Sequence, residues 1–456
     1  MINKIKSFQF SAKQQNIFIF FFIIVWAVFR LFSYGDLKLS IAGNDTPTFV
    51  EASRVPLLSA EMMTGRRLLT TNLIYKILEP ESGYEILVNG SLETSRRELQ
   101  PGFERIVILQ LILSILGWSA LTWTIAHYLR NFVAKIITAL IIPAFAYTPQ
   151  VADWDSILMS ESMTFSLFAL QLSILIFIVF SLYQNPKARI TPYLILWGVV
   201  YFLWANLRDT NNYVALILFA LIGLTLFTPQ FKKHKILIAL MFFIISIFIL
   251  GIVTFRESGR SAISTINIYQ SDIFPHQTRV DYMTKIGMPN QQTAEFHPWL
   301  EEHGTTAIVR FIFAHPGYAI EKLMRDFPEA FKEIQQTYFK TPEMRLWRER
   351  LIDVGEALHP ENSSPFLISL VLLISIITAA IKNKTESSPA WAWLCTYLIL
   401  AGTITIIPTI LGDTWALNRH ALLSTIIYRL SMWFFVIVTI DLALTDENQA
   451  QKITAA

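Results

Sequence analysis

Residues 163–183 read MTFSLFALQLSILIFIVFSLY, which is 21 consecutive residues without a charged side chain. An α-helix needs about 20 apolar residues to cross the hydrocarbon core of a bilayer. Similar segments recur along the chain, and we expect ten spans: Ile17–Phe32, Ile106–Tyr128, Phe132–Tyr147, Met163–Tyr183, Tyr193–Leu207, Tyr213–Phe227, Ile236–Phe255, Phe366–Ile381, Trp391–Leu411 and Leu422–Thr439. The sequence therefore predicts an all-α fold, a polytopic transmembrane helical bundle.

The composition agrees with a chain in contact with membrane lipids. Of the 456 residues, 53% are hydrophobic and only 16% are charged, whereas soluble domains average about 25% charged residues. The net charge of +3 comes without a basic tract, so nucleic acid is not an expected partner. A single cysteine, Cys395, lies in an apolar run and predicts neither a disulfide nor a cysteine-based metal site. We expect one integral membrane domain over residues 1–456.

The basic residues predict the orientation of the chain. If the N-terminus is cytoplasmic, all inside connections are basic, through Arg130, Lys135, Lys187, Arg189, Lys232, Lys233, Lys235, Lys382 and Lys384. The short connections on the other side are residues 148–156, 208–212 and 412–420. Their only Lys or Arg residues are Arg208 and Arg419. Because Lys and Arg accumulate in cytoplasmic loops, we expect both termini in the cytoplasm and the chain in a bacterial inner membrane.

Two long segments then lie outside the cytoplasm, Gly35–Phe103 and Arg256–Pro365. The second contains a helical pattern that can begin at Pro316, where a missing N–H costs nothing. Its apolar residues share one helical face, namely Ile320, Leu323, Met324, Phe327, Phe331 and Ile334. The charged residues Glu321, Lys322, Arg325, Asp326 and Glu329 lie elsewhere on the helix. The apolar face could lie in the membrane interface, cover a cavity or pack on the bundle.

The first polar cluster, Gly43–Phe49, follows the first span on the outer side. It contains Asp45, and a partly desolvated carboxylate at this place could accept the proton of an attacking hydroxyl. The alternative is structural, because Asp45 or Thr46 before Pro47 is a good helix N-cap. The two roles do not exclude each other.

The second cluster is the stretch DWDSILMSES at residues 153–162, which enters the fourth span. Asp153 and Asp155 could hold a divalent cation such as Mg²⁺ or Mn²⁺, or orient a polar acceptor. Glu161 stands about one turn into the helix, and a carboxylate at membrane depth is costly unless it faces a cavity or a partner. The alternative is a helix start with acids at its N-terminus.

Arginines provide candidate phosphate ligands on the same side. Arg208 lies in the hairpin Asn206–Asn212, where it could also pair with Asp209, and Arg256 and Arg260 follow the seventh span. Arg419 and His420 precede the last span. Guanidinium groups offer forked donors to phosphate, although a single arginine at this level can equally anchor the chain to lipid headgroups.

These features resemble GT-C-type membrane glycosyltransferases, such as protein O-mannosyltransferases, aminoarabinose transferases and oligosaccharyltransferase catalytic subunits. The resemblance covers the layout of residues 15–440. It is carried by the early Asp45, by Gly65-Arg66-Arg67 running into Leu68–Leu78, by the stretch from Thr148-Pro149 through Asp153-Trp154-Asp155 to Ser160-Glu161-Ser162, by Arg208-Asp209-Thr210-Asn211 and by Arg419-His420.

The resemblance implies an inverting transfer of a sugar from a polyprenyl-phosphate donor to a glycan, lipid or protein acceptor. Asp45 would be the general base, and Asp153, Asp155 or Glu161 would orient the acceptor or a metal. The donor phosphate would be bound by Arg208, Arg256, Arg260, Arg419 and His420. Two alternatives stay open, a transporter or flippase of lipid-linked glycans and an O-antigen-type polymerase or ligase.

Overall fold

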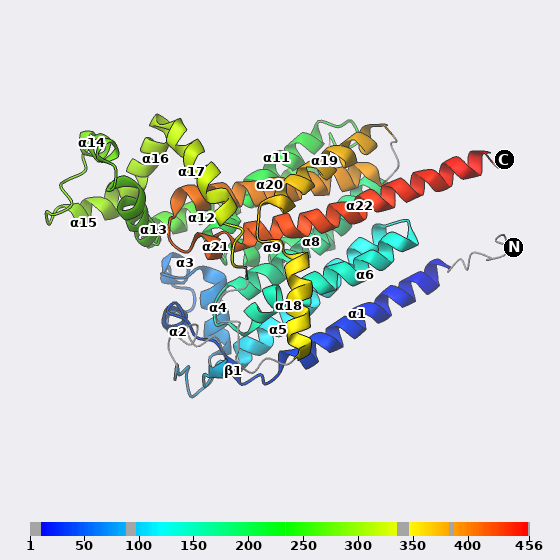
Figure 1. The fold of residues 1–456 in the computed structure, drawn as a ribbon, viewed down its shortest axis with the longest axis horizontal. Coiled ribbons are helices and arrows are strands. Elements are labelled where there is room, and N and C mark those ends of the chain that lie inside the picture. Colours follow the sequence, from blue (N-terminus) through cyan, green and yellow to red (C-terminus); the bar gives the residue numbers. More distant parts are fainter. Residues whose placement is uncertain (1–10, 88–96, 233, 335–345, 383–386, 455–456) are drawn as a thin grey trace.

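The computed structural model describes residues 11–87, 97–232, 234–334, 346–382 and 387–454. Its long apolar helices run side by side and form an elongated bundle (Figure 1). They are α1 (Ala12–Tyr34), α5 (Glu104–Tyr128), α6 (Phe132–Tyr147), α8 (Glu161–Gln184), α9 (Thr191–Ala205), α11 (Val214–Leu226), α12 (Lys235–Ser258), α19 (Ser364–Lys382), α20 (Ser388–Gly412) and α22 (Leu422–Thr454). Each coincides with one predicted span, so the all-α polytopic fold is confirmed.

Eight helices have the length and hydropathy expected of a membrane crossing. In one of them, α11 is counted together with the short helix α10 (Asp209–Asn212) that precedes it. The α6 span has this length and hydropathy together with α7 (Pro149–Ala152) and the 3₁₀ turn Asp153–Ser156, from which it is bent by 48°. Pro149 sits at the first turn of α7, where its missing N–H costs no hydrogen bond. The remaining helix, α9, is apolar but has only 15 residues. The bend brings the 153–162 segment to one end of the bundle.

Burial separates central from peripheral helices. Most residues of α8 are buried, whereas fewer than a quarter of the residues of α1, α12 and α19 are, as expected of helices that face lipid. The central helix packs closely on α5, because a Cβ at Gly117 would collide with the Ser166 carbonyl. The side chains that line the α5–α8 contact therefore belong to the core of the bundle.

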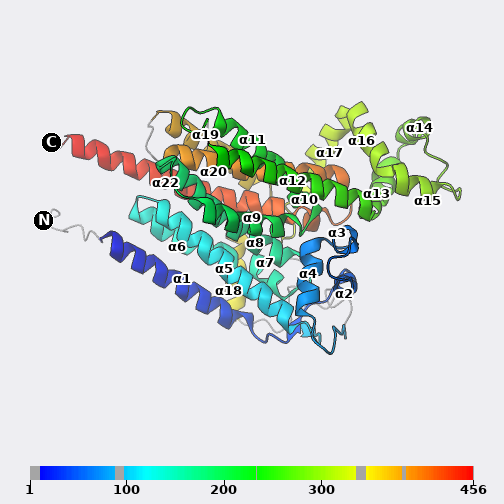
Figure 2. The same ribbon diagram turned by 180° about the vertical axis from the view of Figure 1, so that it is seen from behind.

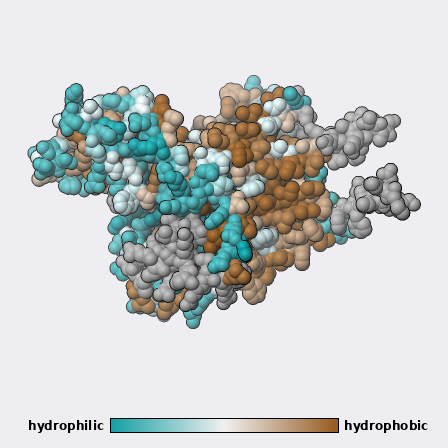
Figure 3. Space-filling model, viewed as in Figure 1, coloured by the Kyte–Doolittle hydropathy of each residue, from teal (hydrophilic) through white to brown (hydrophobic). Residues whose placement is uncertain are grey.

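The described chain ends at Ala12 and Thr454 lie at the same end of the bundle, and the two long connecting segments lie at the other (Figures 1 and 2). Figure 3 shows a hydrophobic belt over the spans and a hydrophilic surface over the lobe formed by α13–α17. The cytoplasmic side itself remains a prediction. Two of the lysines that support it, Lys233 and Lys384, lie outside the described residues.

The first connecting segment, predicted as residues 35–103, folds against the end of the bundle. It contains α2 (Thr46–Ser53), α3 (Glu61–Thr64) and α4 (Leu69–Leu78). Strands β1 (Leu39–Ser40) and β2 (Glu98–Leu99) pair antiparallel, with Leu39 opposite Leu99. An isolated bridge between Ile41 and Ile157 joins this segment to the start of α8.

The second connecting segment, predicted as residues 256–365, forms a lobe with its own apolar core around Tyr269, Met283 and Phe311. The lobe contains α13 (Ser261–Ile268), a π-helix (Tyr269–Ile273), α14 (Gln277–Lys285), α15 (Phe296–Trp299), a second π-helix (Leu300–Gly304), α16 (Thr305–Ala314) and α17 (Pro316–Glu329).

Helix α17 begins at Pro316, as predicted. Leu323 and Phe327 pack on the bundle core, whereas Ile320 and Met324 are exposed. Lys322, which the pattern places off the apolar face, is buried, and its Nζ lies 2.8 Å from both Asp272 and Asp326. The sequence pattern could not show that the carboxylate of Asp272, 50 residues earlier, lies beside Lys322.

Helix α18 (Leu346–Leu358) runs across the direction of the spans (Figure 1). It contacts the bend between α6 and α7, where Gln150 Nε2 donates to the Ile352 carbonyl oxygen. His359 follows directly and is fully buried, with Nε2 at 2.9 Å from the Phe145 carbonyl oxygen. A carbonyl oxygen can only accept, so this nitrogen carries the proton of a neutral ring.

His359 gives a pH prediction. Burial, together with the charge of Arg429, lowers the pKa of His359 to about 3, from an unfolded value near 6.5. Between these values the unfolded chain binds a proton that the folded chain does not, so stability falls as pH decreases from 6.5 toward 3. Since this contribution is about 1.4 kcal/mol per pH unit, the melting temperature of the wild type should fall more steeply from pH 7 to 4.5 than that of His359→Gln. An equal fall in melting temperature with decreasing pH in the wild type and in His359→Gln would contradict the lowered pKa of His359.

Candidate active site

Five charged side chains meet at the end of the bundle that carries the connecting segments. We call them the Asp45 cluster, and its members are Asp45, Arg67, Glu161, Arg208 and Arg419. Arg419 Nη2 lies 2.6 Å from Asp45 Oδ2, and Arg67 Nη2 lies 3.0 Å from Asp45 Oδ1. Arg419 Nε lies 3.1 Å from Glu161 Oε1, and Arg208 Nη1 lies 4.0 Å from the same oxygen. Residues separated by up to 374 positions thus share one site.

Backbone pairing places Asp45 beside the start of α8. Ile41 N donates to the Ser156 carbonyl oxygen at 2.8 Å, and Leu158 N donates to the Ile41 carbonyl oxygen at 2.9 Å. Thr46 Oγ1 accepts from Gly43 N and donates to the Leu158 carbonyl oxygen. The N-terminus of α2 is therefore held against the segment that leads into Glu161.

Other local contacts position the arginines. Thr70 Oγ1 in α4 donates to the Leu203 carbonyl oxygen near the end of α9, which brings the segment before α4 close to Arg208. Arg67 Nε donates to Thr48 Oγ1 at 2.6 Å, and its guanidinium lies over the Phe49 ring at 4.1 Å. Arg419 comes from α21 (Leu417–His420), a short helix that follows the left-handed residue Ala416.

Side-chain exposure decreases across the Asp45 cluster from Asp45 to Glu161. The side chain of Asp45 is 37% exposed, those of Arg419 and Arg67 are 24% and 23% exposed, and that of Glu161 is 2% exposed. Three guanidinium groups and two carboxylates leave one net positive charge. A ligand approaching from solvent therefore meets Asp45 first, and an anion would offset the excess positive charge.

Two buried atoms of the Asp45 cluster form no hydrogen bond within the described residues, Glu161 Oε2 and Arg208 Nη1. Most buried polar atoms in folded proteins have a partner, and exceptions call for a water, an ion or a functional role. Glu161 is also the first residue of α8, and the N-terminal end of a helix favours negative charge. The buried part of the Asp45 cluster, formed by Glu161 and Arg208, thus has one acceptor and one donor that no described protein group satisfies.

Asp45 occupies the N-cap position of α2, as one interpretation of the sequence expected, but its side chain makes no cap hydrogen bond. Its carboxylate goes to the arginines instead. Burial by itself would raise the pKa of Asp45, but Arg419 and then Arg67 outweigh burial and lower it to about 2. Asp45 is therefore held as a carboxylate at every physiological pH.

The other two acids of the second sequence cluster lie elsewhere. Asp155 is buried and pairs with Arg30 of α1, with Arg30 Nη2 at 2.7 Å from Asp155 Oδ2. Ser162 Oγ donates to its second oxygen at 2.6 Å. Asp153 pairs with Arg348 of α18. Of the three acids proposed to orient an acceptor, the structure brings only Glu161 to Asp45.

Within the described residues, none of the remaining predicted phosphate ligands forms an ion pair with a member of the Asp45 cluster. Arg260 is held by Asp209 at 2.9 and 3.2 Å and by the Gly65 carbonyl oxygen, so Asp209 does not pair with Arg208. Arg256 is exposed on the last turn of α12. His420 Nδ1 lies 2.7 Å from Asp413 Oδ2. Burial raises the pKa of Asp413, but His420 and backbone N–H groups outweigh this and lower it.

The predicted divalent cation does not fit these donors. Asp153 and Asp155 each face a different guanidinium, and the carboxylates of the Asp45 cluster face three. No group of three or more His, Cys, Asp or Glu side chains arranged for a metal occurs in the described part of the chain. The cation therefore stays a prediction from the sequence.

Arg67 is the member of the Asp45 cluster that was not predicted from the sequence. It lies in the Gly65-Arg66-Arg67 stretch that contributed to the family resemblance, 22 residues from Asp45. The sequence feature that could have indicated Arg67 is the pair of neighbouring arginines, Arg66 and Arg67, before the helix that begins at Leu69. Only the fold shows that Arg67 turns inward and Arg66 stays exposed.

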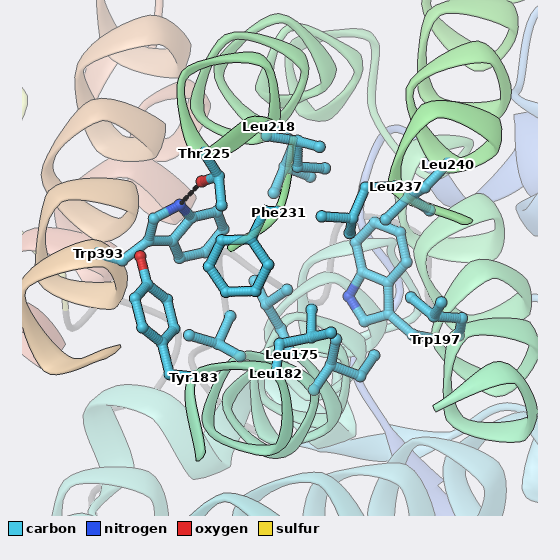
Figure 4. A pocket seen from close by; sticks show the side chains of 14 residues that line it. Leu175, Leu182, Tyr183, Trp197, Leu218, Thr225, Phe231, Leu237, Leu240 and Trp393 are labelled. Carbon is cyan, nitrogen blue, oxygen red and sulfur yellow. Dashed lines mark hydrogen bonds between the residues drawn. The ribbon is translucent and has the colours of Figure 1, made fainter. Parts of the chain in front are cut away.

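A small apolar cavity lies away from the Asp45 cluster, between α8, α9, α11, α12 and α20 (Figure 4). Its walls include Leu175, Tyr183, Trp197 and Phe231, and Trp393 Nε1 donates to Thr225 Oγ1 beside it. Along α8 these walls are about 20–30 Å from Glu161, at 1.5 Å per residue. The cavity is therefore not part of the candidate site.

Comparison with protein-family models finds no match, and comparison with curated protein sequences finds none either. Among solved structures, the chain is similar to oligosaccharyltransferase AglB of Archaeoglobus fulgidus in complex with an inhibitory peptide and dolichol-phosphate. The identity is 13% and the TM-score 0.44, over 95% of this chain and 52% of that one. For the apo form of the Archaeoglobus fulgidus enzyme, the identity is 10% and the TM-score 0.45, again over 95% of this chain and 52% of that one. For its complex with Zn and sulfate, the identity is 12% and the TM-score 0.42, over 95% of this chain and 51% of that one.

The chain thus spans about half the length of these enzymes. They are oligosaccharyltransferases, one of the groups of GT-C-type membrane glycosyltransferases that the sequence resembles. With TM-scores below 0.5, the matches assign no residue role to this chain, and any function has to be argued from the Asp45 cluster itself.

Proposed function

We propose that this protein is a membrane glycosyltransferase that moves a sugar from a polyprenyl-phosphate-linked donor to an acceptor hydroxyl on a glycan, lipid or protein. The observation that carries the proposal is the convergence of an accessible carboxylate, Asp45, with three arginines at one end of a bundle of apolar helices. A carboxylate can remove the proton of an acceptor, and arginines can bind the phosphate of the donor. The site would face the extracytoplasmic side.

In the proposed reaction, the acceptor oxygen attacks the anomeric carbon from the face opposite the phosphate. A new C–O bond forms, the bond between the anomeric carbon and the phosphate oxygen breaks, and the lipid phosphate leaves with the electron pair. The acceptor proton passes to the Asp45 carboxylate. A single displacement of this kind inverts the configuration at the anomeric carbon.

The arginines would stabilise the leaving phosphate. Negative charge grows on the phosphate as the glycosidic bond breaks, and guanidinium donors already in place stabilise that charge without reorganising. Arg208 is well placed for this role, because its side chain is 16% exposed and Nη1 has no hydrogen-bond acceptor within the described residues. Glu161 would keep Arg208 and Arg419 directed toward the same point.

Arg208→Ala tests the donor site. We expect the affinity for a short-chain isoprenyl phosphate to fall by about 10- to 100-fold, because hydrogen bonds to charged groups contribute about 1.5–3 kcal/mol. Arg208→Lys keeps the charge but loses the fork and should recover part of the affinity. Arg256→Ala is the matched control, since that arginine is exposed on α12 and should bind like the wild type. Equal binding by all variants would remove Arg208 from the donor site.

The transporter alternative predicts a different product. Transporters place charged groups near the middle of the bilayer, often in broken helices, whereas the Asp45 cluster lies at the end of the bundle, where α8 begins with Glu161. Protein reconstituted in liposomes with a lipid-linked sugar should therefore form a covalent sugar–acceptor product, detectable by mass spectrometry. Movement of intact donor across the bilayer without such a product would favour the transporter. Repeated addition of sugars to a growing chain would indicate a polymerase.

A further inference from the structure

The resting Asp45 cluster holds its proposed base in an unreactive form. Both carboxylate oxygens of Asp45 face guanidinium groups, Arg419 at 2.6 Å and Arg67 at 3.0 Å. These contacts, against the effect of burial, lower the pKa of Asp45 to about 2. General-base catalysis is most effective when the pKa of the base lies near the working pH. A carboxylate that stays paired in this way would accept a proton poorly.

Arg419 is shared between two carboxylates. Its Nη2 donates to Asp45, while its Nε donates to Glu161 Oε1 at 3.1 Å. Glu161 is buried and keeps a second oxygen without a hydrogen bond within the described residues. The guanidinium can therefore turn away from Asp45 and remain bound to Glu161. Glu161 Oε1 already accepts from Arg419, and Oε2 can accept a further hydrogen bond.

We propose that the phosphate of the donor displaces Asp45 as the partner of Arg419, so that donor binding itself frees the carboxylate for the acceptor proton. This inference rests on the proposed function and gives two residues a defined part in it. Arg419 is the exchanged cation, and Glu161 is a positioning residue that retains Arg419 during the exchange. An anion with several oxygens competes well for a planar, forked donor.

The charges around the two carboxylates agree with such an exchange. Asp45 faces Arg67, from the segment before α4, and Arg419, from α21. Glu161 faces Arg419 and, at 4.0 Å, Arg208 from the connection after α9. The excess of one positive charge means that a phosphate can pair with an arginine without leaving either carboxylate unpaired. Arg67 stays near Asp45 through its hydrogen bond to Thr48 and its contact with Phe49.

The exchange makes Asp45 a competitor of the donor, which is directly testable. The probe is an isoprenyl methyl phosphodiester, whose single charge does not titrate near neutral pH, and the sample is the full chain in lipid nanodiscs. We expect Asp45→Asn to bind the probe about tenfold more tightly than the wild type, since an amide releases Arg419. Glu161→Gln should bind it more weakly, because Arg419 loses its second anchor.

The matched control is Asp281→Asn. Asp281 is an exposed acid of α14 whose side chain accepts from Gln277, so its replacement changes the net charge equally but leaves the Asp45 cluster alone. Its affinity should equal that of the wild type. Equal or weaker binding by Asp45→Asn, or equally tight binding by Asp281→Asn, would overturn the exchange and leave the donor site standing. Folded wild-type protein that does not bind the probe would instead contradict the proposed function.

A pH profile of the wild type gives a second measurement that does not depend on a variant. The acid limb of kcat/KM reports the free enzyme, and that of kcat reports the substrate complex. When Arg419 leaves, the pKa of Asp45 rises, so kcat should begin to fall at a pH at least about one unit above the pH at which kcat/KM falls. Acid limbs at the same pH would show that Asp45 keeps both arginines in the complex.

Discussion

Asp45→Asn is expected to lower the rate of sugar transfer by about 10²–10⁴-fold, the range that general-base catalysis contributes. The amide keeps the size of the side chain and cannot accept the proton of the acceptor. Because Asp45 is partly exposed and makes no cap hydrogen bond, the fold should survive the change. The measurement is the single-turnover rate of product formation in liposomes with a lipid-linked sugar donor.

Two controls accompany this experiment. Asp45→Glu keeps a carboxylate one methylene further out and should retain more activity than the amide. The melting temperature of Asp45→Asn should stay within a few degrees of the wild type, so that lost activity is not lost structure. Full transfer activity in Asp45→Asn would show that another group accepts the proton. His420, held by Asp413 at 2.7 Å, would then be the next residue to replace.

Arg30→Met should have the largest effect on stability. Arg30 and Asp155 are each only 4% exposed and form an ion pair at 2.7 Å, and Arg30 Nη2 also donates to the Ala152 carbonyl oxygen. Removing one partner of a buried ion pair costs about 3–5 kcal/mol, because the other charge remains buried without compensation. We expect a strongly reduced melting temperature and yield in detergent. The double variant Arg30→Met with Asp155→Leu should recover stability.

The neighbouring pair provides the comparison. Asp153 pairs with Arg348, and their side chains are 12% and 26% exposed, so water reaches this pair more than the pair of Arg30 with Asp155. Ion pairs in contact with solvent contribute less than buried ones, about 0.2–1 kcal/mol when fully exposed. Arg348→Met should therefore change stability far less than Arg30→Met. Equal effects of the two substitutions would contradict the structural role assigned to Asp155, and an unchanged melting temperature in Arg30→Met would do the same.

Hydropathy was sufficient to locate ten apolar helices, of which eight meet the criteria for a membrane crossing, α6 meets them only together with its bent continuation, and α9 is too short. A helix in lipid must satisfy its own backbone hydrogen bonds, which requires a long local run of apolar residues. Residues 163–183 coincide with the central helix α8, and even the short α9 was located. The polar segments between the spans were also identified, and four members of the Asp45 cluster, Asp45, Glu161, Arg208 and Arg419, were selected from them.

Pairing within those segments was not predictable from the sequence. Asp153 and Asp155 look alike two residues apart, yet they face different arginines, on α18 and on α1. Arg260 looked like a phosphate ligand, but Asp209 holds it. Arg67 received no role, although it contacts the proposed base. The partner of a charged side chain depends on contacts between segments far apart in the chain, which periodicity and composition do not describe.

The sequence by itself thus determined the positions of the long apolar helices and of the polar segments that carry charge. These properties are local, since each depends on about 20 consecutive residues and their transfer to lipid. Only the tertiary structure decided which charges meet. The bridge between Ile41 and Ile157 brings Asp45 to Glu161, and α21 delivers Arg419 to both. The site is made by long-range packing, because desolvated charges are stable only where opposite charges from other segments meet them.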